Sequence, residues 1–168
     1  MDNNVVFRAA RGLQAAGLAV LRFNFRGAGA SEGAHDGQGA EELDLLAALD
    51  WLHERFRGVP LWVAGFSFGA RTAASLARRE RRIARLICLA LPCKAFDCRF
   101  VVEVLPPTLL LMSKRDEFGT LSDLAERVGP LPAHVHTEEL DGMDHFFRGK
   151  TPELEARVRD YAREHLPQ

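Results

Sequence analysis

Short apolar segments that alternate with helical patterns limit most strongly how this chain can fold. Five candidate strands of five to seven residues occur along the sequence, and all but the last consist mainly of apolar residues. Runs of this length are typical of parallel strands that are buried on both faces of a sheet. Their alternation with helices, without an internal repeat, predicts an α/β fold with a mostly parallel sheet of about five strands and helices on both faces. The expected strands cover residues 18–23, 59–64, 86–90, 108–112 and 134–140.

Cap and stop signals place a helix at the start of the chain and after four of the strands. Side chains that accept hydrogen bonds from free N–H groups occur where three of the helices should begin. Acidic residues lie in the first turn of the second helix, where they complement the helix dipole. The expected helices cover about residues 5–16, 41–55, 69–79, 120–128 and 151 onward, with Asn3 or Asn4, Thr120 and Thr151 as N-caps, Gly17 as the first stop, and Asp123 completing a capping box with Thr120.

The length of the chain predicts a single domain that spans residues 1–168, because 168 residues leave no room for a second one. The composition, 47% apolar and 27% charged residues, is that of a globular protein. No apolar run approaches the ~18 residues that a membrane span needs, and no basic segment precedes an apolar block near the N-terminus. We therefore expect a cytoplasmic protein that does not interact with membranes.

Net charge and cysteine spacing argue against two further classes of protein. With 22 basic and 23 acidic residues the formal net charge is −1, so no overall field attracts nucleic acid. The one basic cluster, residues 78–85, falls at the end of a predicted helix, where cations complement the dipole. Cys88, Cys93 and Cys98 lie five residues apart, which fits neither a zinc site nor a paired disulfide framework. We expect them to be buried or inert thiols.

A serine lies between two glycines where a predicted strand meets a predicted helix, in the segment Gly65-Phe66-Ser67-Phe68-Gly69. In this context the pattern Gly-X-Ser-X-Gly forms a sharp turn, the nucleophile elbow, which lifts the serine hydroxyl clear of the sheet. The two glycines leave room for the turn, and the start of the helix offers N–H groups that favour negative charge. Ser67 is therefore the candidate nucleophile. An ordinary glycine-rich turn with a serine cap is the alternative.

A serine nucleophile needs a base that takes its proton and a carboxylate that orients the base. His145 follows the strand predicted at 134–140, and Asp116 follows the strand predicted at 108–112. Because parallel strands end at the same edge of a sheet, both side chains should lie near Ser67. The chain order Ser, Asp, His is that of the α/β-hydrolases. Four other carboxylates compete for the orienting role, namely Asp97, Glu117, Asp141 and Asp144.

The remaining histidines and the glycine-rich loop do not indicate a cofactor. A dinucleotide-binding fingerprint requires a third glycine where Glu32 stands, and it requires a helix to begin at once. The other histidines lack metal-site spacing with nearby carboxylates. We expect neither a metal nor an organic cofactor from these residues, which are Gly27, Gly29, Gly33, His35, His53, His134, His136 and His165.

Four segments carry a resemblance to a known family, namely Leu21-Arg22-Phe23-Asn24-Phe25-Arg26-Gly27 with its continuation to Gly33, Gly65 to Ala70, Asp116-Glu117-Phe118-Gly119 and Asp144-His145-Phe146-Phe147. Over nearly its whole length the chain resembles small bacterial α/β-hydrolase-fold enzymes related to dienelactone hydrolase and short-chain acyl esterases. The resemblance implies that Ser67 is the nucleophile, His145 the base and Asp116 the orienting acid. It also implies a small-molecule acyl substrate, and an oxyanion that accepts a hydrogen bond from the main-chain N–H of Phe68.

In the family that the chain resembles, further strands and a turn rich in glycine, proline and histidine precede the helix that begins here near Asn4. That turn supplies the second oxyanion N–H, and the loss of one such donor elsewhere costs about 10²–10³ in rate. We therefore expect an N-terminally truncated version of the fold, with Met1 an internal methionine of a longer reading frame. The absent strands would leave an open sheet edge, through which a homodimer could form.

Two functions are compatible with this sequence. The first is a serine hydrolase that cleaves an ester or related acyl bond through an acyl-enzyme intermediate. The alternative is a non-catalytic binding or scaffold protein that keeps the three residues but lacks a complete oxyanion hole. Covalent labelling of Ser67 by a fluorophosphonate distinguishes the two.

Overall fold

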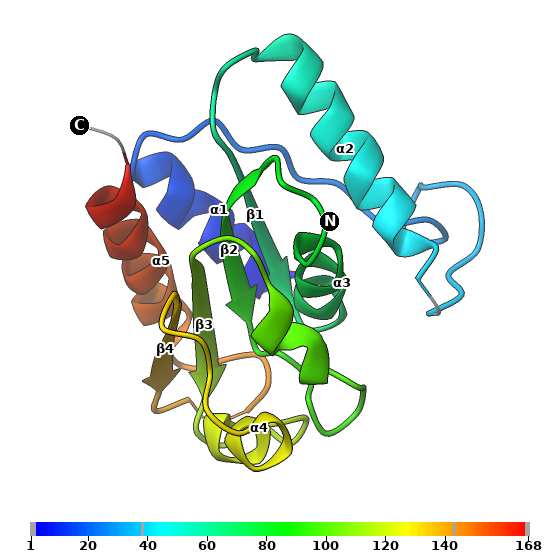
Figure 1. Cartoon of the computed structure of the whole chain (residues 1–168). Helices are drawn as coiled ribbons and strands as arrows, with labels where there is room; N and C mark the ends of the chain where they lie inside the picture. The colour runs from blue at the N-terminus through cyan, green and yellow to red at the C-terminus, as the bar shows by residue number, and fades with distance from the viewer. Residues whose placement is uncertain (1–2, 38, 143, 167–168) are drawn as a thin grey trace.

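Four parallel strands form the central sheet in the computed structural model, which describes residues 3–37, 39–142 and 144–166 (Figure 1). Each strand pairs with the next one along the chain, so the spatial order is β1-β2-β3-β4. This arrangement confirms the predicted parallel α/β fold. The strands are β1 (Leu61–Phe66), β2 (Ile83–Leu89), β3 (Thr108–Ser113) and β4 (Val135–Leu140).

The strand predicted at residues 18–23 is wrong, and the described residues contain four strands instead of about five. This segment is extended but joins no sheet. No strand of the described chain lies beside it to complete a hydrogen-bonded ladder, so its apolar composition alone does not make it a strand. Leu21 and Phe23 remain exposed as a result.

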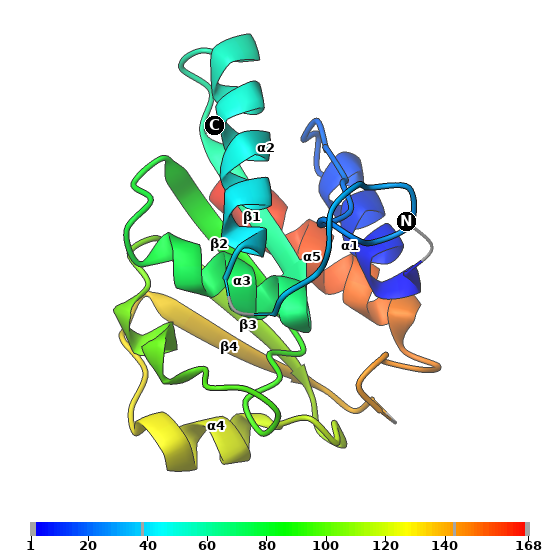
Figure 2. The same cartoon turned by 90° about the vertical axis from the view of Figure 1, so that its right-hand side faces the viewer.

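Helices cover both faces of the sheet, as the sequence predicts (Figures 1 and 2). The first and last helices pack against each other on one face. The other face carries the helix that follows β1, a second helix packed beside it, and two short helices. In chain order the helices are α1 (Asn4–Ala15), α2 (Glu41–Arg55), α3 (Phe68–Ala77), the 3₁₀ helix η1 (Arg99–Glu103), α4 (Leu121–Val128) and α5 (Thr151–His165).

The core divides into two parts because successive side chains of a strand point to opposite faces. In β2, Leu86 and Cys88 contact the α3 face, whereas Ile87 and Leu89 contact the face covered by α1 and α5. All four side chains are at most 1% exposed. The strand β3 alternates in the same way, so these two strands are buried on both sides. They hold the loops at their carboxyl ends in fixed positions.

Two of the three predicted helix N-caps are present in the structure. The side chain of Asn3 accepts a hydrogen bond from the Val6 N–H and caps α1, and the capping box of Thr120 and Asp123 at α4 is confirmed. Thr151 is not an N-cap, because Lys150 holds that position and Thr151 is the first helical residue. Met1, on which the longer reading frame was predicted, lies outside the described residues.

The three cysteines are free and buried, as expected from their spacing. Burial raises the pKa of each thiol, most strongly at Cys88, and brings the pKa of Cys98 to about 12. The thiolate form is therefore scarce near neutral pH. Among the helices in the described ranges, none is both long and apolar enough to span a bilayer.

Candidate active site

The junction of β1 and α3 is a tight turn with Ser67 at its apex. Ser67 has φ 53° and ψ −119°, a conformation that residues with a Cβ rarely adopt. Its main-chain N–H donates to the carbonyl of Leu89, and its own carbonyl accepts from the Arg71 N–H. These bonds tie the strained residue to the sheet on one side and to the helix on the other.

Of the two glycines in the turn, only Gly65 is required by close packing. A Cβ at Gly65 would lie 2.3 Å from the carbonyl oxygen of Gly69 and 2.6 Å from the nitrogen of Ala70, both main-chain atoms. A Cβ at Gly69 would instead meet only the ring of Phe25, at an ordinary contact distance of 3.8 Å. The prediction that both glycines make room for the turn is therefore correct for Gly65 alone.

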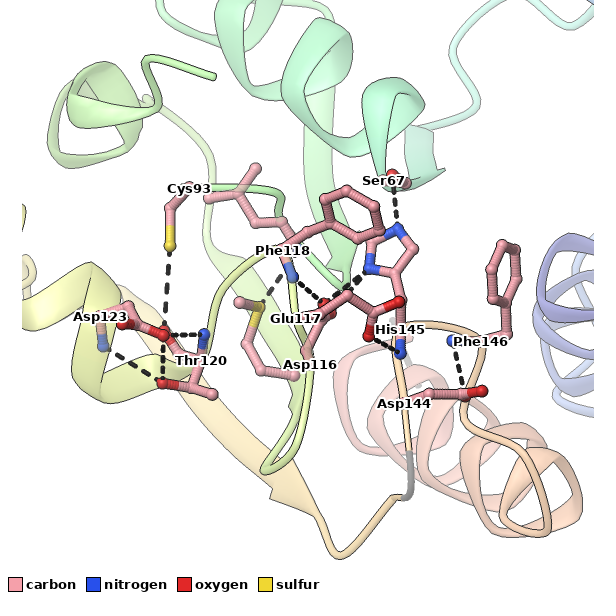
Figure 3. Close-up of polar contacts among 12 residues, drawn as sticks. Ser67, Cys93, Asp116, Glu117, Phe118, Thr120, Asp123, Asp144, His145 and Phe146 are labelled. Carbon is pink, nitrogen blue, oxygen red and sulfur yellow. Dashed lines mark hydrogen bonds and ion pairs between the residues drawn. The ribbon is translucent and has the colours of Figure 1, made fainter. Parts of the chain in front are cut away.

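The structure brings Ser67, His145 and Asp116 together from three separate loops (Figure 3). The Ser67 Oγ lies 2.7 Å from His145 Nε2. On the other side of the ring, His145 Nδ1 lies 2.8 Å and 2.9 Å from the two carboxylate oxygens of Asp116. His145 and Asp116 are each 3% exposed, so water competes little for these hydrogen bonds.

The partners of the imidazole determine which nitrogen carries its proton. A carboxylate only accepts hydrogen bonds, so Nδ1 of His145 is the protonated nitrogen facing Asp116. Nε2 is then free to accept the hydroxyl proton of Ser67. The arrangement matches that of a nucleophile, a general base and an orienting carboxylate.

Among the five carboxylates considered for the orienting role, only Asp116 reaches the imidazole within the described part of the chain. Asp97 forms an exposed ion pair with Arg99, whose hydrogen bonds lower the pKa of Asp97 to about 2. Asp144 accepts hydrogen bonds from the N–H groups of Phe146 and Arg148 and thereby shapes the loop.

Glu117 has a role that the sequence did not reveal. One of its carboxylate oxygens accepts a hydrogen bond from the main-chain N–H of His145, at 3.2 Å (Figure 3). Two consecutive carboxylates thus bind the histidine: Asp116 contacts the ring of His145, and Glu117 contacts the main chain of His145. Adjacent acidic residues after a strand were the available signal, but sequence alone does not show which of them faces the ring.

Aromatic rings surround the imidazole. The ring centroids of Phe118, Phe66 and Phe146 lie 4.7, 4.9 and 5.4 Å from that of His145. Phe118 and Phe146 are also more than 40% exposed, so they present apolar surface to solvent beside Ser67. These two rings therefore give the surroundings of His145 a partly apolar surface.

The main-chain N–H of Phe68 is available to an incoming group. Phe68 is the first residue of α3, where helical N–H groups have no partner within the helix. No acceptor for this N–H occurs among the residues that the structure describes. A helix N-terminus also favours negative charge, so this position suits an oxyanion that forms next to Ser67. Over the same described ranges, no cluster of three or more metal-binding side chains is present.

Comparison with known proteins places this site in a family. The sequence profile of the alpha/beta hydrolase domain matches residues 1–161. This chain belongs to the alpha/beta hydrolase family. The family resemblance and the fold predicted from the sequence are thus confirmed.

Relatives of this alpha/beta hydrolase include proteins of known structure. An uncharacterised protein of Rickettsia prowazekii is 34% identical over 170 residues, which cover 96% of this chain and 71% of that protein. An alpha-beta serine hydrolase homologue from Coxiella burnetii is 33% identical with a TM-score of 0.87, over 96% of this chain and 77% of that one. A serine hydrolase without a lid from Xanthomonas campestris is 33% identical with a TM-score of 0.85, over 100% and 76% of the two chains.

Proposed function

We propose that this alpha/beta hydrolase is a serine esterase that cleaves small acyl esters through a covalent acyl-enzyme. The observation that carries the proposal is the 2.7 Å contact between Ser67 Oγ and His145 Nε2, with Asp116 bound to the opposite nitrogen. Two relatives at 33% identity, from Coxiella burnetii and Xanthomonas campestris, are described as serine hydrolases or their homologues, which supports the same chemistry.

In the first half of the reaction, Ser67 Oγ attacks the acyl carbon while its proton moves to His145 Nε2. The carbonyl oxygen becomes negatively charged and accepts a hydrogen bond from the N–H of Phe68. The ester C–O bond then breaks, and the alcohol leaves with the proton from Nε2. The acyl group remains bound to Oγ of Ser67.

In the second half, a water molecule attacks the acyl carbon and His145 removes its proton. The bond between the acyl carbon and Ser67 Oγ breaks, and the proton returns from Nε2 to Oγ as the carboxylic acid leaves. Asp116 keeps Nδ1 protonated and stabilises the imidazolium that forms twice in this cycle. The exposed rings of Phe118 and Phe146 favour acyl or alcohol groups with an apolar surface.

The activity test compares wild type with Ser67→Ala on para-nitrophenyl acetate and butyrate. We expect kcat/KM to fall to background, a loss on the order of 10⁶-fold, because the nucleophile is gone. Ser122→Ala is the matched control, since Ser122 lies exposed in α4 and should retain full activity. Equal rates for wild type and Ser67→Ala would refute the proposal. Absent hydrolysis and absent fluorophosphonate labelling of the folded wild type would favour the non-catalytic alternative.

A further inference from the structure

A second histidine, His35, is paired with a buried carboxylate next to the elbow. It lies in the segment that leads into α2, which passes beside α3 (Figure 2). Its Nδ1 lies 2.6 Å from the Oε1 oxygen of Glu41, whose side chain is fully buried. Its ring centroid lies 4.8 Å from that of Phe68, the residue after the nucleophile. His145 instead contacts the ring of Phe66, the residue before the nucleophile.

The contact with Glu41 leaves one nitrogen of His35 free. Burial favours the neutral acid, but hydrogen bonds from the main-chain N–H groups of Glu41, Gly37 and Asp36 lower the pKa of Glu41 to about 2. The carboxylate only accepts hydrogen bonds, so Nδ1 of His35 carries a proton. Within the described part of the chain, Nε2 of His35 has no hydrogen-bond partner.

His35 is accessible to a ligand and is nevertheless held in place. Its side chain is 54% exposed, whereas the carboxylate that binds it is inaccessible to solvent. An exposed side chain normally loses conformational freedom when it binds a ligand, and this loss weakens binding. The bond to Glu41 and the contact with Phe68 restrict the ring in advance. The free nitrogen is thus preorganised for a hydrogen bond.

His35 is also the polar member of the group of rings around Phe68. Among the described residues, the rings that contact Phe68 are those of His35, Phe96 and Phe25, with centroids at 4.8, 5.9 and 6.1 Å. In the proposed reaction the carbonyl oxygen of the ester lies at the main-chain N–H of Phe68. A polar group of the substrate near this carbonyl would therefore find its hydrogen-bonding side chain in His35.

We propose that His35 is a specificity-determining residue that binds a hydroxyl group of the ester near the reacting carbonyl, an inference that rests on the proposed esterase function. A hydroxyl donates to the free Nε2 of a neutral imidazole and accepts from a protonated one, so it pairs with either form. A carboxylate in the same place would face the negative charge of Glu41. The hydroxyl belongs to the acyl or to the alcohol part of the ester, and the test separates the two.

Two pairs of esters, each with a hydroxyl in place of a methyl group, test this role. Hydroxyethyl butyrate and propyl butyrate differ in the alcohol part, and ethyl lactate and ethyl isobutyrate differ in the acyl part. The measured quantity is the ratio of kcat/KM for the hydroxylated ester to that for its partner. His35→Phe should lower this ratio by about 3- to 10-fold in one of the pairs, because phenylalanine keeps a ring against Phe68 but lacks the nitrogen atoms.

Comparison of the ratio between proteins removes any difference in the intrinsic reactivity of the esters. His35→Leu also lacks the nitrogen atoms and should lower the same ratio, so the result does not depend on one variant. His53→Phe is the matched control, since His53 is exposed in α2 and should leave both ratios unchanged.

The outcomes separate this inference from the proposed function. If the His35 variants hydrolyse the esters with the ratios of wild type, His35 only packs against Phe68 and the inference is wrong. A ratio that falls equally in His53→Phe would also overturn it. If the folded wild type hydrolyses none of the four esters, the esterase function is refuted and the role of His35 with it.

Discussion

The carboxylate of Asp116 accepts hydrogen bonds from two donors at once. These two bonds determine how a substituted side chain would be oriented at this position. Its Oδ1 accepts the main-chain N–H of Phe118 at 2.8 Å and also lies 2.9 Å from His145 Nδ1. Because the Phe118 N–H is fixed by the loop, any replacement side chain must keep an acceptor pointing toward it. The other polar atom of that side chain must then face the imidazole of His145.

Asp116→Asn should therefore reverse the tautomer of His145. The amide oxygen would stay on the Phe118 N–H, so the NH₂ group would donate to Nδ1 and the ring proton would move to Nε2. Nε2 could no longer accept the proton of Ser67. We expect kcat/KM to fall by about 10⁴-fold in ester hydrolysis, with thermal stability little changed.

Glu117→Gln is the matched control for Asp116→Asn, because it also removes one carboxylate. The amide oxygen of glutamine can still accept the His145 main-chain N–H, so activity should stay within about tenfold of wild type. If both variants lost activity equally, the loss would reflect overall charge, and the orienting role of Asp116 would be contradicted.

At the scale of elements, the contact between β1 and α3 separates the two glycines of the elbow. Gly65→Ala should destabilise the protein by about 1–3 kcal/mol, because its Cβ would overlap main-chain atoms of α3. Gly69→Ala should change the free energy of unfolding by no more than about 1 kcal/mol, since its Cβ makes an ordinary contact and alanine favours the helix. Urea unfolding of the two variants measures both effects, and equal destabilisation would argue against the close approach.

Residues 35–37 are bound to α2 by a buried carboxylate. Burial alone would raise the pKa of Glu41, but hydrogen bonds from its own main-chain N–H and from the N–H groups of Gly37 and Asp36 outweigh it and lower the pKa to about 2. The nearby His35 contacts both Glu41 and the ring of Phe68, so this loop also borders the elbow.

A lowered pKa in the folded state means that Glu41 stabilises the protein above the pKa of the unfolded chain. That contribution should disappear as the pH falls from about 4.5 to about 2. Glu41→Gln should therefore be less stable than wild type at pH 7, and the gap between the two should narrow over this window. Urea midpoints across the pH range measure the gap, with the exposed Glu126→Gln as control. A gap that is independent of pH would contradict this origin of the stability.

The elements differ in how far their sequence determines them. The central strands β2 and β3 were predictable because both of their faces are buried, so their residues are apolar whatever the details of packing. Residues 18–23 have the same composition, yet a strand also requires a neighbour, which a local pattern does not show. In the same way, the sequence placed Asp116 and His145 at the correct sheet edge, but the neighbouring acidic residues did not show that Glu117 would bind the main chain of His145.

For the whole molecule, the candidate site is assembled at one edge of a parallel sheet, where three strands end. The triad residues lie on loops beyond the carboxyl ends of β1, β3 and β4, which are all paired in the sheet.

The most direct test of the proposed function is mass spectrometry of protein quenched during turnover of para-nitrophenyl acetate. We predict a mass increase of one acetyl group on the peptide that contains Ser67. In the variant His145→Gln the adduct should form slowly. Once formed, it should also be lost more slowly than in wild type, because deacylation needs the same base. Hydrolysis that depends on this protein but leaves no adduct on Ser67, or an adduct confined to another residue, would contradict the assignment.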